Sequence, residues 1–290
     1  MTLDNQLEIV DSHLHFWKLS RQDYAWLTPY LGVLYQDRLP LDWQQASTGL
    51  GVNKAVVIQA APTDAETDFL LSLTQKSDSL AGVVGWVDMN AHSSLVCARL
   101  QQLAAEPKFK GIRPMLQDIE DVEWILNPNF TPIFNFLIEH NLSFDALVRG
   151  EHLDAILHIA QTFPDLKMVI NHCAKPNIHA NAFDNWATSI CRFSSLSNVY
   201  VKVSGLSTEA GRKQQLVEHY QHYFQHITKV FGVERMMWGS DWPVVNINNS
   251  YKGWFDLCRE LVSSWSQREQ IRFWSGTASE FYRLNEEKVI

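Results

Sequence analysis

The stretch VDSHLH (residues 10–15) places two histidines one residue apart, directly after an aspartate, at the end of a short apolar run. Titratable side chains are costly inside a buried strand unless they are paired or bound. Residues two apart on a strand share a face, so His13 and His15 are predicted to point the same way, with Ile9 and Asp11 below them. The stretch therefore predicts a strand whose carboxyl end carries nitrogen ligands or proton carriers.

Further along the chain, short apolar runs rich in β-branched residues recur between amphipathic, helix-like stretches. Most runs are continuously apolar, as expected of parallel strands that are buried on both faces. The eight runs cover residues 7–13, 54–60, 81–88, 109–114, 142–148, 167–172, 199–205 and 235–241. Alternation about every 30 residues is typical of stacked βα units and predicts a single (β/α)8 TIM barrel over residues 1–290. The alternative is an open doubly wound sheet, which would usually show a glycine-rich phosphate turn that this chain lacks.

Two of the helical stretches carry recognisable start signals. Thr63 and Glu66 have capping-box spacing at the head of a helix over 63–75. Thr131 is predicted to cap a helix over 131–140, with Pro132 in its first position. Helices are also predicted over 151–163 and 214–231. We assign the histidines of the last one, His219, His222 and His226, to an outer helix surface.

The first connection, residues 16–43, follows the first predicted strand and is unusually long. Its aromatic residues include Trp17 and Trp26. Long loops in compact domains are usually lids or binding loops. The alternative is that these aromatics only plug the mouth of the barrel. We expect Trp17 and Trp26 to offer apolar faces to a substrate.

Composition narrows the classes of function. The net charge is −8, which argues against a nucleic-acid partner because such proteins need a basic face. The chain has no apolar stretch of membrane-spanning length and no secretory leader pattern at its first residues. The four cysteines form no C-x-x-C pair, so we expect reduced thiols and a cytoplasmic protein.

Two more strand ends carry polar residues. His172 ends the sixth run in VINHCAKP and Asp241 ends the eighth in MMWGSDWPV. Taken alone, His172 could be a core histidine and Asp241 a helix cap. The carboxyl ends of the strands of a barrel meet at one mouth, so His13, His15, His172 and Asp241 are predicted to converge on one site.

As a set, these motifs resemble the amidohydrolase superfamily. The similarity extends over nearly the whole chain, through DSHLHFW, FKGIRPMLQD, LSFDALVRG, NHCAKP, VYVKVSGL, WGSDWPV and GTASEFYRL in family order. It is greatest to the amidohydrolase-related branch, which includes L-fucono- and L-rhamnono-lactonases and 2-pyrone-4,6-dicarboxylate lactonase. The resemblance implies a lactonase, a hydrolase of carboxylic esters.

The chain departs from superfamily members with two metals, because its fourth strand ends in Arg113 and its fifth offers Asp145, where those members have a bridging lysine or glutamate. The resemblance therefore implies at most one divalent ion, such as zinc, on some of His13, His15, His172 and Asp241. The same residues could also work without a metal.

The implied catalytic roles divide among these four residues. Asp241 is expected to act as general base, His13 and His15 to polarise the carbonyl, and His172 to orient the water or bind the ion. Arg113 and Lys202 are cations on apolar strands and are expected to bind substrate together with Asp145. An internal salt bridge with Asp145 or Asp118 is the alternative for both cations.

The predicted reaction is hydrolysis of a neutral sugar-acid lactone, since the first loop is rich in tryptophan and tyrosine and the strand ends offer few cations. Two alternatives remain: a zinc-dependent carboxy-lyase of the same superfamily and a non-catalytic sugar-acid-binding barrel. The carboxy-lyases tend to have paired glycines after the later histidine, where this chain has HCAKP. The expected partner is a small-molecule lactone, and the sequence leaves open whether the chain forms a homo-oligomer.

Overall fold

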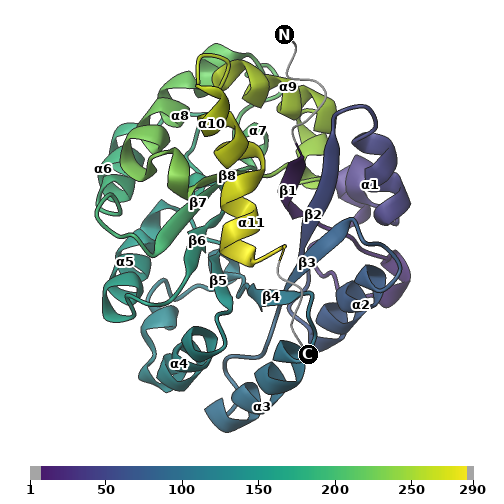
Figure 1. Cartoon of the computed structure of the whole chain (residues 1–290), viewed down its shortest axis with the longest axis vertical. Coiled ribbons are helices and arrows are strands. Elements are labelled where there is room, and N and C mark those ends of the chain that lie inside the picture. Colours follow the sequence, from purple (N-terminus) through teal and green to yellow (C-terminus); the bar gives the residue numbers. More distant parts are fainter. Residues whose placement is uncertain (1–7, 286–290) are drawn as a thin grey trace.

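The computed structural model describes residues 8–285, which form a ring of strands surrounded by helices (Figure 1). The eight strands pair in parallel, each with the next along the chain. They are β1 (Ile9–Leu14), β2 (Val52–Ile58), β3 (Leu80–Gly85), β4 (Phe109–Ile112), β5 (Ser143–Ala146), β6 (Met168–Ile170), β7 (Val199–Val203) and β8 (Met236–Trp238). This confirms the predicted (β/α)8 barrel and excludes the open doubly wound sheet.

Helices surround the strands, and most of them cover the outward faces of the strands. They are α1 (Pro40–Ala46), α2 (Asp64–Thr74), α3 (Ser93–Ala104), α4 (Thr131–Glu139), α5 (Leu153–Thr162), α6 (Asp184–Cys191), α7 (Leu206–Glu209), α8 (Val217–Phe231), α9 (Tyr251–Leu261), α10 (Gln267–Ile271) and α11 (Thr277–Tyr282). Thr63 caps α2 as predicted, because its hydroxyl accepts from the Glu66 N–H at 3.1 Å. Thr131 is not a cap: α4 begins at Thr131 and its N-cap is Phe130.

The barrel closes where β1 meets the segment that follows β8. The Asp241 N–H donates to the His13 carbonyl at 2.8 Å, and the His15 N–H donates to the Trp242 carbonyl at 2.8 Å. The Ser12 hydroxyl adds a bond to the Trp238 carbonyl at 2.6 Å. The backbone hydrogen bonds that close the barrel therefore bring Asp241 next to His13 and His15, three residues of the predicted site.

The side chains of β1 do not alternate in the simple way that the sequence suggests. The pairing of β1 with β2 is irregular between Asp11 and Leu14. Ile9 packs in the outer layer of the core, and the Asp11 carboxylate accepts from the Ser240 N–H at 2.8 Å and the Tyr251 hydroxyl at 2.9 Å. The prediction that Ile9 and Asp11 share a face with His13 is therefore wrong, because this irregularity shifts the alternation.

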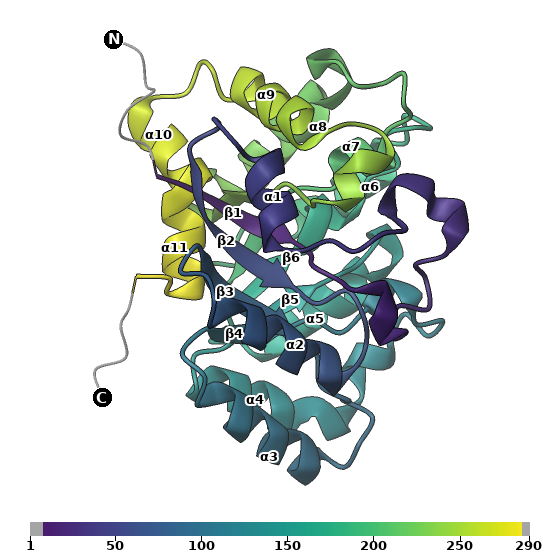
Figure 2. The ribbon, with the colours of Figure 1, turned by 90° about the vertical axis from the view of Figure 1, so that its right-hand side faces the viewer.

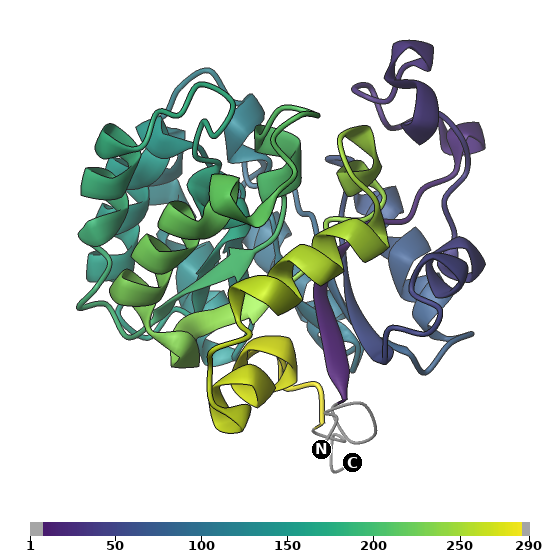
Figure 3. The ribbon, with the colours of Figure 1, turned by 90° about the horizontal axis from the view of Figure 1, so that it is seen from above.

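One end of the barrel is closed by α11, which crosses it in Figure 1. Its side chains Ala278, Phe281 and Tyr282 pack in one apolar cluster with strand residues such as Val10 and Val169. The long first loop stands at the opposite end of the barrel (Figures 2 and 3). The end with the site is thus left open, while the other end is filled.

Two further predictions concern the whole chain. All four cysteines are free thiols, as the sequence predicts. Within residues 8–285, no helix is both long and apolar enough to cross a membrane.

We predict that Phe281→Ala lowers the free energy of unfolding by about 3–5 kcal/mol, the usual cost of deleting a buried aromatic ring. Phe281 is 1% exposed, and the cavity would lie in the packed end of the barrel. Urea unfolding measures the change. Tyr30→Ala is the matched control, because Tyr30 is 100% exposed and should change stability by less than about 0.5 kcal/mol. A loss below about 1 kcal/mol for Phe281→Ala would show that α11 does not seal the barrel.

Candidate active site

Three histidines surround one carboxylate at the open end of the barrel. The Nε2 atoms of His13, His15 and His172 lie 3.7, 3.4 and 3.8 Å from Oδ1 of Asp241. All four residues are buried. Strands β1, β6 and β8 thus bring together the four residues that the sequence predicts to form the site.

The other ring nitrogen of each histidine is also held. His15 Nδ1 lies 2.9 Å from the Ile58 carbonyl, which only accepts, so this nitrogen carries the proton and the Nε2 lone pair faces Asp241. His172 Nδ1 lies 2.9 Å from the Ser204 hydroxyl. His13 Nδ1 lies 3.4 Å from Nζ of Lys202. Such contacts fix ring orientation and are typical of catalytic and metal-binding histidines.

Unusual backbone conformations place two of these residues. His172 and the three residues after it have φ between 50° and 58°, and Asp241 has φ 56°. L-residues rarely adopt this left-handed region, and each costs roughly 1–2 kcal/mol relative to the right-handed one. Strain of this kind clusters at functional sites. It turns the chain sharply after β6 and β8, so that both side chains lie at the barrel mouth.

Two glycines let neighbouring strands approach these histidines. A Cβ on Gly205 would lie 2.5 Å from Nδ1 of His172, and one on Gly239 would lie 2.7 Å from Cβ of His13. Both distances are far shorter than van der Waals contact. The rings of His13 and His172 therefore occupy space that any larger residue at these two positions would fill.

Burial determines the charge state of the site. It lowers the pKa of His172 to about 3, and it also lowers the pKa values of His13 and His15. Burial alone would raise the pKa of Asp241, but His172, His15 and Lys175 outweigh it and hold that pKa below its usual value. At neutral pH the site is a carboxylate facing neutral imidazoles, the protonation states that metal ligands require.

These residues fit a metal ion. One ligand atom from each of His13, His172 and Asp241 lies within 4.8 Å of the others. His13 Nε2 is buried without a hydrogen-bond partner among the described residues, which is costly for a polar atom. The lone pair of His15 Nε2 also faces a carboxylate oxygen at 3.4 Å, an arrangement that a cation between them would stabilise.

Beneath His13 lies a buried ion pair. Nζ of Lys202 is 2.7 Å from Oδ2 of Asp145, and both side chains are completely buried. The Tyr282 hydroxyl of α11 also donates to Asp145, at 2.8 Å. The prediction that Lys202 and Asp145 bind substrate is corrected, because each neutralises the other below the cavity floor; the salt bridge considered as the alternative is the one found.

Above the four residues lies a cavity of about 250 Å³. His15, His172 and Asp241 line its floor, while Arg113, Lys175 and Trp26 are among its walls. Arg113 is buried, donates to the Gln59 carbonyl, and has a pKa that burial lowers to about 10. Lys175 lies 3.8 Å from Glu209 of α7.

The first loop supplies both core and cavity wall. Trp17 is fully buried, donates to the Gln36 carbonyl at 2.8 Å and does not line the cavity, so the prediction that it binds substrate is wrong. It packs against the ring of Trp26 at 5.4 Å. Leu31 and Leu34 of the same loop line the cavity with Trp26.

Sequence reasoning missed Ser204 and Glu66. Ser204 lies two residues after Lys202 on the same strand run, and this spacing is the signal in the sequence that could have placed it near the site.

Glu66 does not complete the capping box. Its carboxylate instead accepts from the N–H groups of Ala60 and Ala61 at 2.9 and 2.5 Å. The Ala60 carbonyl in turn accepts from Nε1 of Trp26 at 2.6 Å. Glu66 therefore anchors the wall of the cavity from behind.

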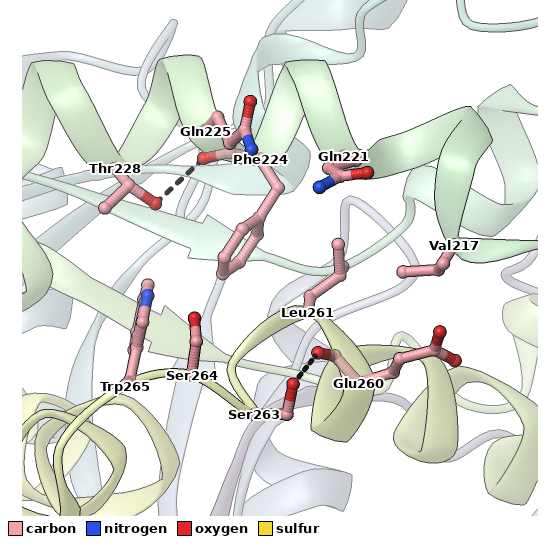
Figure 4. Close-up of a pocket in the computed structure, with 10 residues that line it drawn as sticks. All are labelled: Val217, Gln221, Phe224, Gln225, Thr228, Glu260, Leu261, Ser263, Ser264 and Trp265. Atoms are coloured by element: carbon pink, nitrogen blue, oxygen red, sulfur yellow. Dashed lines mark hydrogen bonds between the residues drawn. The ribbon is translucent and has the colours of Figure 1, made fainter.

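Another hollow lies on the outside of the barrel between α8 and α9 (Figure 4). Glu260 is the one ionisable side chain among its lining residues, which include Phe224 and Trp265. His219, His222 and His226 lie on α8 as predicted, away from the barrel mouth. This hollow therefore lacks the groups that chemistry would need.

A parallel barrel with three histidines and an aspartate at its carboxyl end is the arrangement of a hydrolase with a metal-ligand site. The family model described as Amidohydrolase matches residues 10–284. The chain belongs to the amidohydrolase family, as its motifs predict.

Known relatives agree with this family. The L-fucono-1,5-lactonase of Burkholderia ambifaria is 36% identical over 95% of this chain and 96% of its own. The crystal structure of an amidohydrolase from Burkholderia multivorans with bound zinc has a TM-score of 0.88 and is 30% identical, covering 95% of this chain and 99% of the other. A probable 2-pyrone-4,6-dicarboxylic acid hydrolase from Acinetobacter baumannii has a TM-score of 0.78 over 96% of this chain and all of its own; at 15% identity it shows the shared fold alone.

We predict that Glu66→Gln flattens the dependence of stability on pH. Burial raises the pKa of Glu66 to about 8, against 4.5 for an ordinary glutamate. The folded state then binds this proton more tightly than the unfolded state. Its contribution to stability is complete below about pH 4.5 and is lost as the pH rises towards about 8.

Glutamine keeps the acceptor and cannot ionise, so the slope of unfolding free energy across this window should become less negative, by up to about 1.4 kcal/mol per pH unit. Urea unfolding at several pH values measures it. Glu106→Gln, at an exposed position, is the control. An unchanged slope in Glu66→Gln would mean that Glu66 is ionised throughout.

Proposed function

We propose that this protein hydrolyses the lactone of a neutral sugar acid. The observation that carries the proposal is the Asp241 carboxylate, set among three histidine Nε2 atoms at 3.4–3.8 Å on the floor of the cavity. A carboxylate in that position can take a proton from water, and the lone pair of His15 Nε2 can accept a hydrogen bond from the same water. The similarity to an L-fucono-1,5-lactonase supports the same reaction class.

In the proposed reaction, Asp241 removes a proton from a water molecule held at the cavity floor, and the water oxygen attacks the lactone carbonyl carbon. The bond between that carbon and the ring oxygen then breaks. Asp241 returns its proton to the leaving ring oxygen. The products are a hydroxyl group and a carboxylic acid, which ionises at neutral pH and releases a proton.

We further propose that His13, His15, His172 and Asp241 provide the ligands for one divalent ion, and that this ion is zinc. Imidazole nitrogen is a ligand that zinc favours, and the amidohydrolase from Burkholderia multivorans has bound zinc. When bound, such an ion polarises a carbonyl and makes water more acidic. Independently of the ion, Ser204, Lys202 and the Ile58 carbonyl fix the rings of the three histidines.

The walls of the cavity favour a neutral, hydroxylated ring. Trp26 offers an indole face, and Leu31 and Leu34 add apolar surface. Of the two cations on the walls, Lys175 lies near Glu209 and Arg113 has its Nε without a hydrogen-bond partner among the described residues. Because Arg113 lines the cavity, we infer that its guanidinium donates to a ring substituent, and that the substrate is a six-carbon or deoxy aldonolactone. We also infer a cytoplasmic enzyme, consistent with its four free thiols.

We predict that Asp241→Asn lowers kcat for an aldonolactone by at least about 100-fold, since general-base catalysis contributes roughly 10²–10⁴-fold. The assay is a lactone panel in weak buffer with a pH indicator, with and without chelator. Asp165→Asn, at an exposed position, is the control, and near-ultraviolet circular dichroism checks folding.

Turnover by Asp241→Asn within ten-fold of wild type would mean that another group activates the water. Release of carbon dioxide from an aromatic or enol acid, with no lactone hydrolysed, would favour the carboxy-lyase. Binding of sugar acids without any turnover would favour the non-catalytic barrel.

We predict that Arg113→Ala lowers kcat/KM for the aldonolactone by about 5–150-fold, equivalent to losing about 1–3 kcal/mol for a hydrogen bond to a charged group. The measurement compares an aldonolactone with a dicarboxylic lactone in wild type and variant. Arg268→Ala, at an exposed site far from the cavity, is the control. A strong wild-type preference for the dicarboxylic lactone, lost in Arg113→Ala, would overturn the substrate class and leave the lactonase reaction standing.

A further inference from the structure

A second hollow, of about 420 Å³, adjoins the catalytic cavity. It lies over the carboxyl ends of β2, β3 and β4, and the side chains of Trp26, Met115 and Asp118 line both spaces. The two hollows thus share three lining residues and lie next to each other. The second hollow is therefore a candidate position for a substituent on a ligand bound in the catalytic cavity.

Three tryptophans are among the residues that line this hollow. Trp26, Trp86 and Trp124 line it and are all partly exposed. Of the other apolar lining residues, Val87 and Met89 are each only 3% exposed, whereas Met115 and Ile119 are partly exposed and add to the surface. We call these three tryptophans, with the space between them, the tryptophan subsite.

Polar groups of the subsite are acidic or neutral. Asp88, Asn90 and Asp118 are exposed at its edge. None of the residues that line it is a lysine or an arginine. The subsite therefore does not suit a second carboxylate or a phosphate, which would meet uncompensated negative charge.

Two of the indoles are fixed in place. Nε1 of Trp124 donates to the Asn90 side chain at 3.0 Å, and its ring packs on Phe130 at 4.5 Å. Nε1 of Trp26 donates to the Ala60 carbonyl at 2.6 Å. Pre-positioned aromatic faces lose little conformational entropy when they bind a ligand.

We propose that the tryptophan subsite binds a second sugar ring attached to the lactone ring, so that the enzyme also hydrolyses lactones of disaccharide acids. Flat indole faces cover the C–H faces of a pyranose, while carboxylate and amide groups at the edge accept from and donate to its hydroxyls. An alkyl chain would form no hydrogen bond with the exposed side chains of Asp88 and Asn90, whereas sugar hydroxyls can bind the donors and acceptors that these side chains still have free. This inference rests on the proposed lactonase activity and extends its substrate class.

The test compares single-ring and two-ring substrates. Disaccharide lactones are prepared in which the lactone ring is the single-ring lactone that the enzyme hydrolyses best, with a hexose attached at each available hydroxyl in turn. We expect at least one linkage to be hydrolysed with a kcat/KM equal to or above that of the single ring. Trp124→Ala and Trp86→Ala should each lower kcat/KM for that substrate about ten-fold, as for the loss of one aromatic contact, and change it less than two-fold for the single ring.

The single-ring reaction is the internal control for folding, because a destabilised variant loses both activities together. Trp265→Ala, in the hollow between α8 and α9, is the matched tryptophan control. It should leave the ratio of the kcat/KM values for the two substrates unchanged. Failure of every two-ring lactone, with the single ring still hydrolysed, would overturn this inference alone. So would a preference for the same lactone carrying an alkyl chain, or equal losses on both substrates in the two subsite variants. Absence of any lactone hydrolysis would instead reject the proposed function.

Discussion

The backbone seam between β1 and the segment after β8 is the constraint on which this site depends. Two hydrogen bonds there, from Asp241 to His13 and from His15 to Trp242, close the barrel. The same bonds place the proposed general base beside two of its three histidine neighbours. Folding and assembly of the site are therefore one event, because the barrel cannot close without bringing Asp241 to the end of β1.

The seam is supported from the other end of the barrel. Tyr282 of α11 donates to Asp145, Asp145 pairs with Lys202, and Lys202 contacts the ring of His13. Each of these groups would be costly to bury alone, and together they satisfy one another. A continuous set of polar contacts thus runs from the filled end of the barrel to the floor of the cavity. The left-handed turn after β6 adds strain there that the surrounding packing must hold.

Burial and ion pairing set the charges around the cavity. Burial keeps the histidines neutral and leaves Asp241 as a carboxylate, so the floor can accept a proton or help hold a cation. Lys202 is neutralised below the floor and Lys175 faces Glu209 at the rim. The protein thus already provides a carboxylate partner for each of these two lysines. The tryptophan subsite beside the cavity continues its aromatic surface and has carboxylates, but no lysine or arginine, among its lining residues.

The sequence alone determined the eight strands, the barrel and the residue types at strands 1, 6 and 8, because these features follow from local periodicity and strand order. It also carried the motifs of the family. Only the tertiary structure decided which polar residues face the cavity. Lys202 and Asp145 proved to be mutual partners, and Trp17 proved to be core. Glu66 proved to support the wall through Ala60 and Ala61. These assignments depend on contacts between residues far apart in the chain and on an irregularity in β1, and neither leaves a trace in local periodicity.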